Sequence, residues 1–160
     1  MDFKQSSELR YRNTPVQEFT TPMVYAKKIE PAGIDFIIAQ GSHDGLNYYV
    51  RNIECRHPTA YIEIPQGHKA YNMDFNNWEY NLIDVHGGVT YQSDGLPCVD
   101  PNGERDHKFV GWDYAHAGDY EGYYEGESRQ FVNELHKWTT EEIVAECIRA
   151  IDQINSLRGI

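Results

Sequence analysis

The stretch from residue 139 onward is the part of this chain whose local structure its own residues dictate most strongly. Thr139 and Glu142 form a capping box: the threonine oxygen accepts from exposed helix amides, and the glutamate reaches back to the first residue. Apolar residues then recur at near-helical spacing, at positions 143, 144, 147, 148, 151 and 154. We predict an amphipathic helix that ends at about residue 156 and packs on a sheet.

The chain before this helix has the pattern of short strands separated by turns. Strands are predicted at 34–39, 46–54, 61–64 and 109–114, with a further strand, interrupted or bulged at glycines, at 82–91. Turns are predicted at 41–45 and 65–68, a short helix at 74–80, a polar loop at 93–107, and a helical piece at 131–138. Strands first and a helix last indicate an α+β fold with a mainly antiparallel sheet.

Length, charge and hydropathy indicate the domain organisation and argue against two classes of protein, those that bind duplex nucleic acid and those that enter the membrane. Residues 1–22 are expected to form an extended N-terminal segment, and 23–160 a single domain. The net charge of −11 disfavours binding to duplex nucleic acid. No run of 18 apolar residues is present, and the start lacks the apolar stretch of a signal peptide, so we expect a cytoplasmic protein that does not enter the membrane.

The three cysteines are widely spaced. Cys55, Cys98 and Cys147 form no Cys-x-x-Cys pair, which argues against a structural zinc site. Cys147 falls on the apolar face of the predicted helix, so we expect a core thiol there. A nucleophilic role for Cys55 or Cys98 stays open.

Two motifs concentrate the residues that carry chemistry. The first is Asp-Val-His-Gly-Gly-Val-Thr-Tyr at 84–91, and the second is Gly-Trp-Asp-Tyr-Ala-His-Ala-Gly-Asp at 111–119. Histidine and aspartate are common proton carriers and metal ligands, and glycine lets a ligand approach the backbone closely. We predict that the two motifs meet in one site.

Within that site, His86 and His116 are the predicted acid–base pair. Asp113 and Asp119 are predicted to orient them, on the condition that the chain bends after residue 113, because strand geometry would point Asp113 and His116 to opposite sides. The alternative is that all four residues ligate a divalent metal, although their spacing matches no strict metal motif. We expect no other cofactor.

A second set of residues is predicted to bind the ligand. The amides of Gly87 and Gly88 and the hydroxyl of Thr90 are suited to an anionic oxygen. Lys69 is a further candidate, for binding phosphate. Tyr91 and Tyr114 lie beside the catalytic residues in the sequence, and Tyr114 is suited to stacking on a base.

Together with Ile-Pro-Gln-Gly-His at 64–68 and the terminal amphipathic helix, these motifs resemble those of a family of small proteins found in phages and in bacterial genomes as prophage genes. The resemblance covers roughly residues 59 to 155. It implies a role in countering host defences that use nucleotide signals, either by cleaving the signal or by sequestering it.

The leading hypothesis is a phosphodiesterase-like hydrolase that acts on a nucleotide-type signal such as a cyclic oligonucleotide. The first alternative is a non-catalytic protein that binds and sequesters the same nucleotide. The second is a protein-interaction factor that uses its acidic surface to mask a host protein. A homo-oligomer is also open, because the C-terminal helix could join two subunits.

Overall fold

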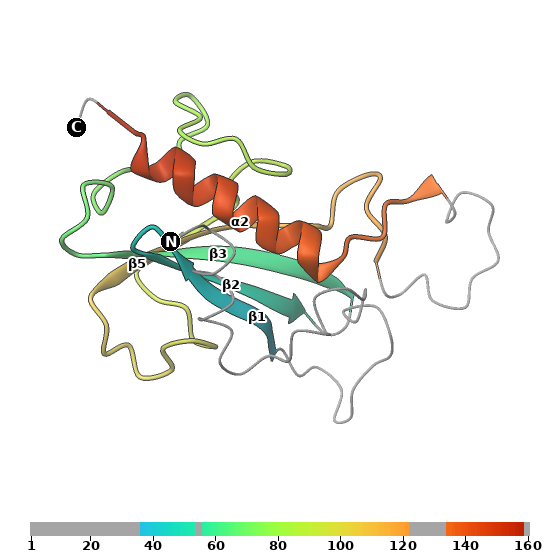
Figure 1. Cartoon of the computed structure of the whole chain (residues 1–160), viewed down its shortest axis with the longest axis horizontal. Helices are drawn as coiled ribbons and strands as arrows, with labels where there is room; N and C mark the ends of the chain where they lie inside the picture. Colours follow the sequence, from blue (N-terminus) through green and yellow to red (C-terminus); the bar gives the residue numbers. More distant parts are fainter. Residues whose placement is uncertain (1–35, 54–55, 122–133, 159–160) are drawn as a thin grey trace.

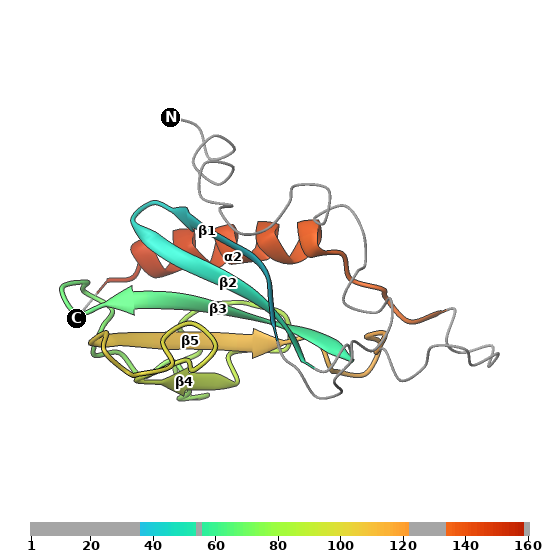
Figure 2. The same cartoon turned by 90° about the horizontal axis from the view of Figure 1, so that it is seen from below.

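A five-stranded antiparallel sheet packed against one C-terminal helix forms the described part of the chain. The computed structural model describes residues 36–53, 56–121 and 134–158. Its elements are β1 (Phe36–His43), β2 (Leu46–Ile53), β3 (His57–Pro65), β4 (Tyr91–Ser93), β5 (His107–Asp113) and α2 (Thr140–Asn155). The strands lie in the order β1-β2-β3-β5-β4, and every neighbouring pair is antiparallel (Figure 2). The predicted α+β class is confirmed, whereas the extended segment predicted at 1–22 lies outside the described residues.

The two faces of the sheet are covered differently. Helix α2 packs across β1, β2 and β3 on one face (Figure 1), over a buried row on β3 formed by Ala60, Ile62 and Ile64. Alternate residues of a strand point to opposite faces, so Tyr61 and Glu63 face the other side. There a second apolar cluster forms around Tyr61 and includes Leu96, from the loop between β4 and β5.

The first hairpin turns later than predicted. Strand β1 continues through Gly41 to His43, and the turn is made by Asp44 and Gly45, both at positive φ. Gly41 stays in the strand because the Tyr48 ring covers it: a Cβ on Gly41 would lie 2.3 Å from the Tyr48 hydroxyl oxygen. The glycine marks a close approach of a side chain rather than a turn.

The terminal helix confirms the prediction in its bounds and its capping. The Thr139 hydroxyl oxygen accepts from the Glu142 amide at 3.1 Å, and the Glu142 carboxylate accepts from the Thr139 amide at 2.9 Å. Cys147 is fully buried, and this burial raises the pKa of its thiol well above the usual value, as a core thiol requires. The helix therefore begins at the expected residue and turns its apolar stripe to the sheet.

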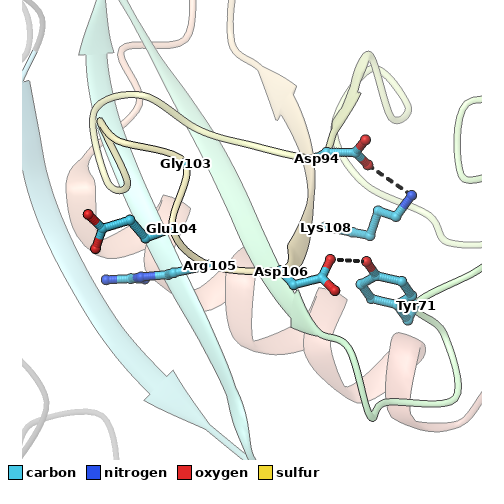
Figure 3. Close-up of a pocket in the computed structure, with 7 residues that line it drawn as sticks. All are labelled: Tyr71, Asp94, Gly103, Glu104, Arg105, Asp106 and Lys108. Atoms are coloured by element: carbon cyan, nitrogen blue, oxygen red, sulfur yellow. Dashed lines mark hydrogen bonds and ion pairs between the residues drawn. The ribbon is translucent and has the colours of Figure 1, made fainter.

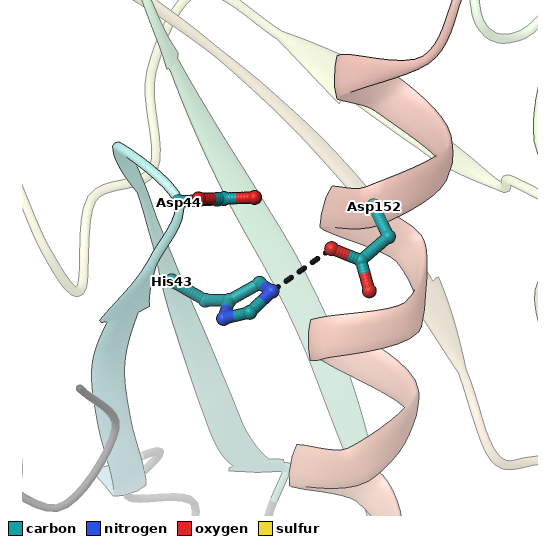
Figure 4. Close-up of side chains that lie close together, drawn as sticks. All are labelled: His43, Asp44 and Asp152. Atoms are coloured by element: carbon teal, nitrogen blue, oxygen red, sulfur yellow. Dashed lines mark hydrogen bonds and ion pairs between the residues drawn. The ribbon is translucent and has the colours of Figure 1, made fainter. Parts of the chain in front are cut away.

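Polar contacts attach the last turns of α2 to loops. His43 at the end of β1 lies 2.9 Å from the Asp152 carboxylate, as Figure 4 shows. The Lys69 ammonium donates to the carbonyls of Asn155 and Leu157, both at 2.8 Å. These carbonyls have no partner within the helix, and a cation is favourable at a helix C-terminus.

The region between β3 and β4 contradicts two predictions. Residues 74–80 form turns instead of a helix, and 82–90 are irregular, with only Tyr91–Ser93 in a strand. The backbone of Asp84 pairs with the side chain of Gln153 on α2, at 2.6 and 2.9 Å. A side chain of α2 satisfies these backbone groups, and Gly87 and Gly88 adopt positive φ, which a regular strand does not allow. The segment is therefore bonded to α2 and does not join the sheet as a strand.

The segment before α2 also differs from its prediction. Of the helical piece predicted at 131–138, residues 134–138 are described, and they form no α-helix. His136 makes an isolated parallel bridge with Asp119 instead. In the described ranges, no helix combines the length and hydropathy that a membrane span requires.

Candidate functional site

The structure brings the two motifs together at the end of β5. The His86 Nε2 atom lies 2.8 and 3.0 Å from the two carboxylate oxygens of Asp119, although the residues are 33 positions apart. The rings of His86 and His116 are in edge contact, with centroids 5.4 Å apart. Two histidines and two aspartates from separate segments therefore share one place on the molecule.

Asp119 is a buried carboxylate surrounded by donors. Its side chain is 3 % exposed. Besides His86, it accepts from the Trp138 indole N–H at 2.8 Å and from the His116 backbone amide at 2.9 Å. A buried carboxylate is tolerated when its oxygens are hydrogen-bonded in this way. Asp119 thus holds the His86 ring in one orientation and leaves Nδ1 without a hydrogen-bond partner among the described residues.

The turn that places Asp119 is built from local and long-range hydrogen bonds. The Asp119 amide donates to the His116 carbonyl at 2.9 Å, and Gly118 takes a positive φ of 94°. The His136 amide donates to the Gly118 carbonyl at 2.7 Å. Trp138 follows His136 by two residues, so the hydrogen bond between His136 and Gly118 also positions the Trp138 indole beside Asp119.

His116 and Asp113 form a second histidine–carboxylate pair. The His116 Nε2 atom lies 3.2 Å from Asp113 Oδ1, but the angles do not meet those of a hydrogen bond, so this nitrogen is buried without a hydrogen-bond partner. It packs against Gly87, where an added Cβ would lie 2.1 Å from it. The predicted bend after β5 is present, because the Ala115 amide donates to the Asp113 carboxylate at 3.1 Å.

Two buried side chains, Tyr114 and Glu146, and the partly buried Trp138 support His86. Tyr114 stacks on it with centroids 4.9 Å apart and planes 6° apart, and Trp138 lies at 4.8 Å. The Tyr114 hydroxyl donates to the buried Glu146 carboxylate at 2.5 Å. Burial, reinforced by the charge of Glu146, raises the pKa of Tyr114, so the phenol stays protonated as a donor. Glu146 also lies 3.4 Å from the His86 amide.

Trp138 and Glu146 are site residues that the sequence motifs do not reveal. Trp138 lies just before the capping box, and Glu146 lies in α2 beside Cys147, between residues of the apolar stripe. A glutamate that is 8 % exposed in a helix is unusual, because charged groups are buried only with partners. The interruption of the stripe by an acidic residue was the available signal.

The predicted ligand-binding glycines and threonine divide into two groups. The Gly88 amide donates to the Val85 carbonyl at 2.9 Å and is not available to an anion, which corrects that expectation. The Gly87 amide has no hydrogen-bond partner among the described residues. The Thr90 hydroxyl is exposed and donates to Asp113 at 3.3 Å. Gly87 and Thr90 therefore stay candidates for ligand contact.

Three other predicted ligand contacts lie elsewhere. Lys69 binds carbonyls at the C-terminal end of α2, away from the capped N-terminal end beside the site. Tyr91 packs edge-on against Tyr61 on the other face of the sheet, with centroids 5.2 Å apart. Tyr114 is fully buried beneath His86, so its ring supports the imidazole and presents no face to a base. Tertiary packing, which proximity in the sequence does not report, separates Lys69 and Tyr91 from the His86 region and buries Tyr114 beneath the imidazole.

The four predicted metal ligands form two separate pairs, His86 with Asp119 and His116 with Asp113, and do not converge on one point. Within the described ranges, three metal-ligating side chains gather at His43, Asp44 and Asp152, with ligand atoms within 4.8 Å of one another (Figure 4). His43 and Asp152 already pair with each other, and this contact links the first hairpin to α2. The geometry of the motif residues thus favours the acid–base arrangement over a metal centre.

A second polar cluster lies on the face of the sheet opposite α2. Glu63 on β3 is 2 % exposed and accepts from Tyr49 at 2.6 Å, from Arg105, and from Nδ1 of His107 in a short contact. Arg105 also lines an open pocket of about 390 Å³, together with Tyr71, Asp106 and others (Figure 3). The motifs at 84–91 and 111–119 did not point to this cluster.

No protein-family model matches the chain, and no curated protein or solved structure matches it either. The geometry of the two clusters is therefore the basis on which a function is inferred.

Proposed function

We propose that the chain is a phosphodiesterase-like hydrolase that cleaves a nucleotide-type signal, such as a cyclic oligonucleotide, in the cytoplasm of a phage-infected host. One observation carries the proposal: His86 and His116 lie with ring centroids 5.4 Å apart, each beside its own carboxylate. Paired imidazoles supply the general base and general acid that cleavage of a phosphodiester needs. The resemblance to small phage and prophage proteins supports the choice of substrate class.

In this proposal Nδ1 is the nitrogen of each histidine that transfers a proton. Both histidines turn Nε2 toward a carboxylate, so Nδ1 is the nitrogen of each that is left for a substrate. His86, with its Nε2 proton held by Asp119, accepts the proton of the attacking water at Nδ1. His116 in its protonated form donates a proton to the leaving oxygen.

The groups beside the histidines bind the phosphate. The Gly87 amide, which lacks a partner among the described residues, donates to one non-bridging oxygen. The exposed Thr90 hydroxyl donates to the other after it turns away from Asp113, to which it donates over 3.3 Å in the free protein. Gly87 packs against the His116 ring and Thr90 contacts Asp113, which supports a role for both residues beside the general acid. Tyr114 and Trp138 contribute by holding His86 rigid, which preserves the geometry of proton transfer.

The test is turnover of defined signals by the purified full-length chain. A panel of cyclic di- and trinucleotides is incubated with the protein, and products are separated by chromatography. We expect one signal to be cleaved, with His86→Ala and His116→Ala each lowering kcat by about 10²–10⁴-fold while affinity changes little. His43→Gln is the matched control, because it alters a histidine–carboxylate pair away from the site.

The same experiment separates cleavage from sequestration. Recovery of every nucleotide intact, together with tight binding to one of them, would reject the hydrolase and favour a binding protein that removes the signal. A His86→Ala variant that loses binding and biological effect in parallel would point the same way. Absence of both cleavage and binding would leave neither nucleotide hypothesis standing.

A further inference from the structure

A second oriented histidine lies outside the proposed active site. His107 begins β5, and its Nδ1 atom makes a short hydrogen bond with the buried carboxylate of Glu63 on β3. The His107 side chain is 31 % exposed, and Nε2 has no hydrogen-bond partner among the described residues. A carboxylate on Nδ1 fixes the proton there and leaves the lone pair on Nε2, the outward nitrogen. The carboxylate therefore holds the ring by one nitrogen and leaves the other without a partner among the described residues.

Glu63 is kept ionised although it is buried. Burial by itself raises the pKa of a carboxyl group, but hydrogen bonds from Tyr49, His107 and Arg105 outweigh it and lower the pKa of Glu63. Asn47 adds a weaker contact at 3.4 Å. A negative charge thus lies against Nδ1 of His107 at neutral pH, where it stabilises any positive charge that forms on the ring.

Arg105 adds a cation beside the same carboxylate. One of its terminal nitrogens lies 3.1 and 3.0 Å from the two Glu63 oxygens, and its side chain is 42 % exposed. The other terminal nitrogen has no partner among the described residues. Arg105 also lines an open pocket of about 390 Å³, whose other lining residues include Glu104, Asp106 and Lys108 but not His107 (Figure 3). A guanidinium in this position matches the oxygens of a phosphoryl group.

We propose that His107 is a phosphoryl-acceptor site, with Glu63 as its positioning residue and Arg105 as the group that binds the phosphoryl oxygens. The Nε2 lone pair attacks the phosphorus of a phosphoramidate or acyl-phosphate donor and forms a P–N bond, while the bond from phosphorus to the leaving group breaks. With a phosphoramidate the leaving group departs as ammonia. The ring gains a positive charge, which Glu63 balances through the Nδ1 proton. The site is independent of the proposed hydrolase.

The test uses phosphoramidate as the donor and the full-length chain as the acceptor. The protein is incubated at neutral pH, and the adduct is located by mass spectrometry of peptides kept above acidic pH, since P–N bonds are acid-labile. We expect one phosphoryl group on His107 and none there in His107→Gln, whose amide can still donate to Glu63. Glu63→Gln, which keeps the shape but removes the charge, should slow the reaction by about tenfold.

His136 is the matched control. Its side chain is more exposed, at 51 %, but the part-exposed Glu142 contacts Nε2 of His136, whereas Glu63 contacts Nδ1 of His107. The nitrogen that is left without a carboxylate therefore differs between the two histidines. Labelling of His136 as fast as His107 would mean that exposure alone sets the rate, and would overturn the proposal. Failure of His107 to react, or an unchanged rate in a folded Glu63→Gln variant, would also overturn it.

Discussion

In the His86 region and in the Glu63 region, a buried carboxylate holds a part-exposed imidazole, but the two arrangements are built differently. Asp119 and Glu63 are both nearly inaccessible, at 4 % and 2 % exposure. Asp119 lies in a turn after β5 and binds Nε2 of His86, whereas Glu63 lies within β3 and binds Nδ1 of His107. The first pair depends on turns and glycines, and the second depends on the register of paired strands.

The donors around the two carboxylates also differ. Asp119 accepts from an indole and a backbone amide besides His86, while Glu63 accepts from a guanidinium and a phenol besides His107. Burial, reinforced by the hydrogen bond to Glu63, raises the pKa of Tyr49 to about 12, so that phenol donates throughout the physiological range. The comparison indicates that the Glu63 region contributes mainly charge pairing, whereas the Asp119 region contributes mainly orientation.

The sharpest test of this difference is removal of each carboxylate. Glu63→Ala leaves Arg105 and Tyr49 without their acceptor and should lower the free energy of unfolding by about 3 kcal/mol, the lower end for broken buried pairs, because Arg105 is part exposed. Asp119→Ala removes an acceptor from uncharged donors and should cost about 1–3 kcal/mol. Urea unfolding measures both, and a larger loss for Asp119→Ala would reverse the comparison.

The pH dependence of the free energy of unfolding tests whether the Glu63 region contributes charge pairing. The pKa of Glu63 is lowered on folding, so the unfolded chain binds more protons and stability rises with pH in this window. The contribution is complete above the ordinary value of 4.5 and is lost as pH falls through the lower, folded pKa. Urea unfolding between pH 7 and pH 3 should show a shallower decline in Glu63→Gln than in the wild type.

Glu142 also contributes to the pH dependence of stability, and its contribution must be separated from that of Glu63. Burial raises the pKa of Glu142, but the Thr139 amide and His136 outweigh this and lower it, so Glu142 loses stabilisation in the same direction. The difference between the wild type and Glu63→Gln isolates the Glu63 part. Identical pH profiles would contradict the pairing assigned to Glu63.

The glycines test the dependence of the His86 region on its turn. Gly87 and Gly88 have φ of 71° and 81°, so an alanine at either position costs about 1–2 kcal/mol of backbone strain. A Cβ on Gly87 also meets the His116 ring, whereas one on Gly88 meets nothing within 4 Å. Gly87→Ala should therefore shift the His116 ring resonances in NMR spectra and lower turnover. Gly88→Ala should leave both close to wild type.

The capping box gives the smallest expected effect. Thr139→Ala removes the hydroxyl that accepts from the Glu142 amide and should lower the free energy of unfolding by about 1 kcal/mol. Thermal unfolding followed by circular dichroism measures this loss. Glu141→Ala, an exposed change in the same turn, is the control and should cost less. Because Trp138 precedes the cap, a much larger loss would mean that the cap also holds the indole on Asp119.

Sequence patterns predicted the elements whose cause is local. The capping box and the apolar stripe placed α2 to within one residue of its observed end, and alternation of side chains located the middle of β3. The segment 82–91 was mistaken for a strand because its apolar residues join the core while its backbone bonds to side chains of α2 instead of a neighbouring strand. Only contacts with Gln153 and Glu146, about 60 to 70 positions later, decide that outcome.

The residues of the candidate site divide in the same way. The motifs identified His86, Asp113, His116 and Asp119 from residue type and glycine content, and the structure brings these four together. The support from Trp138 and Glu146 could not be predicted, because it depends on where α2 lies across the sheet. Lys69 was assigned to the ligand because a lysine after a turn carries no sign of the helix end that it caps.

By itself, the amino-acid sequence determined the strand-rich chain, the capped C-terminal helix and the two motifs, since propensity, capping and side-chain periodicity act over a few residues. The tertiary structure alone decided that β5 lies between β3 and β4, that Asp119 holds His86, and that Glu63 gathers Tyr49, Arg105 and His107. These arrangements join residues 14 to 44 positions apart. Such pairings follow from which surfaces can be buried together, and no local pattern encodes that choice.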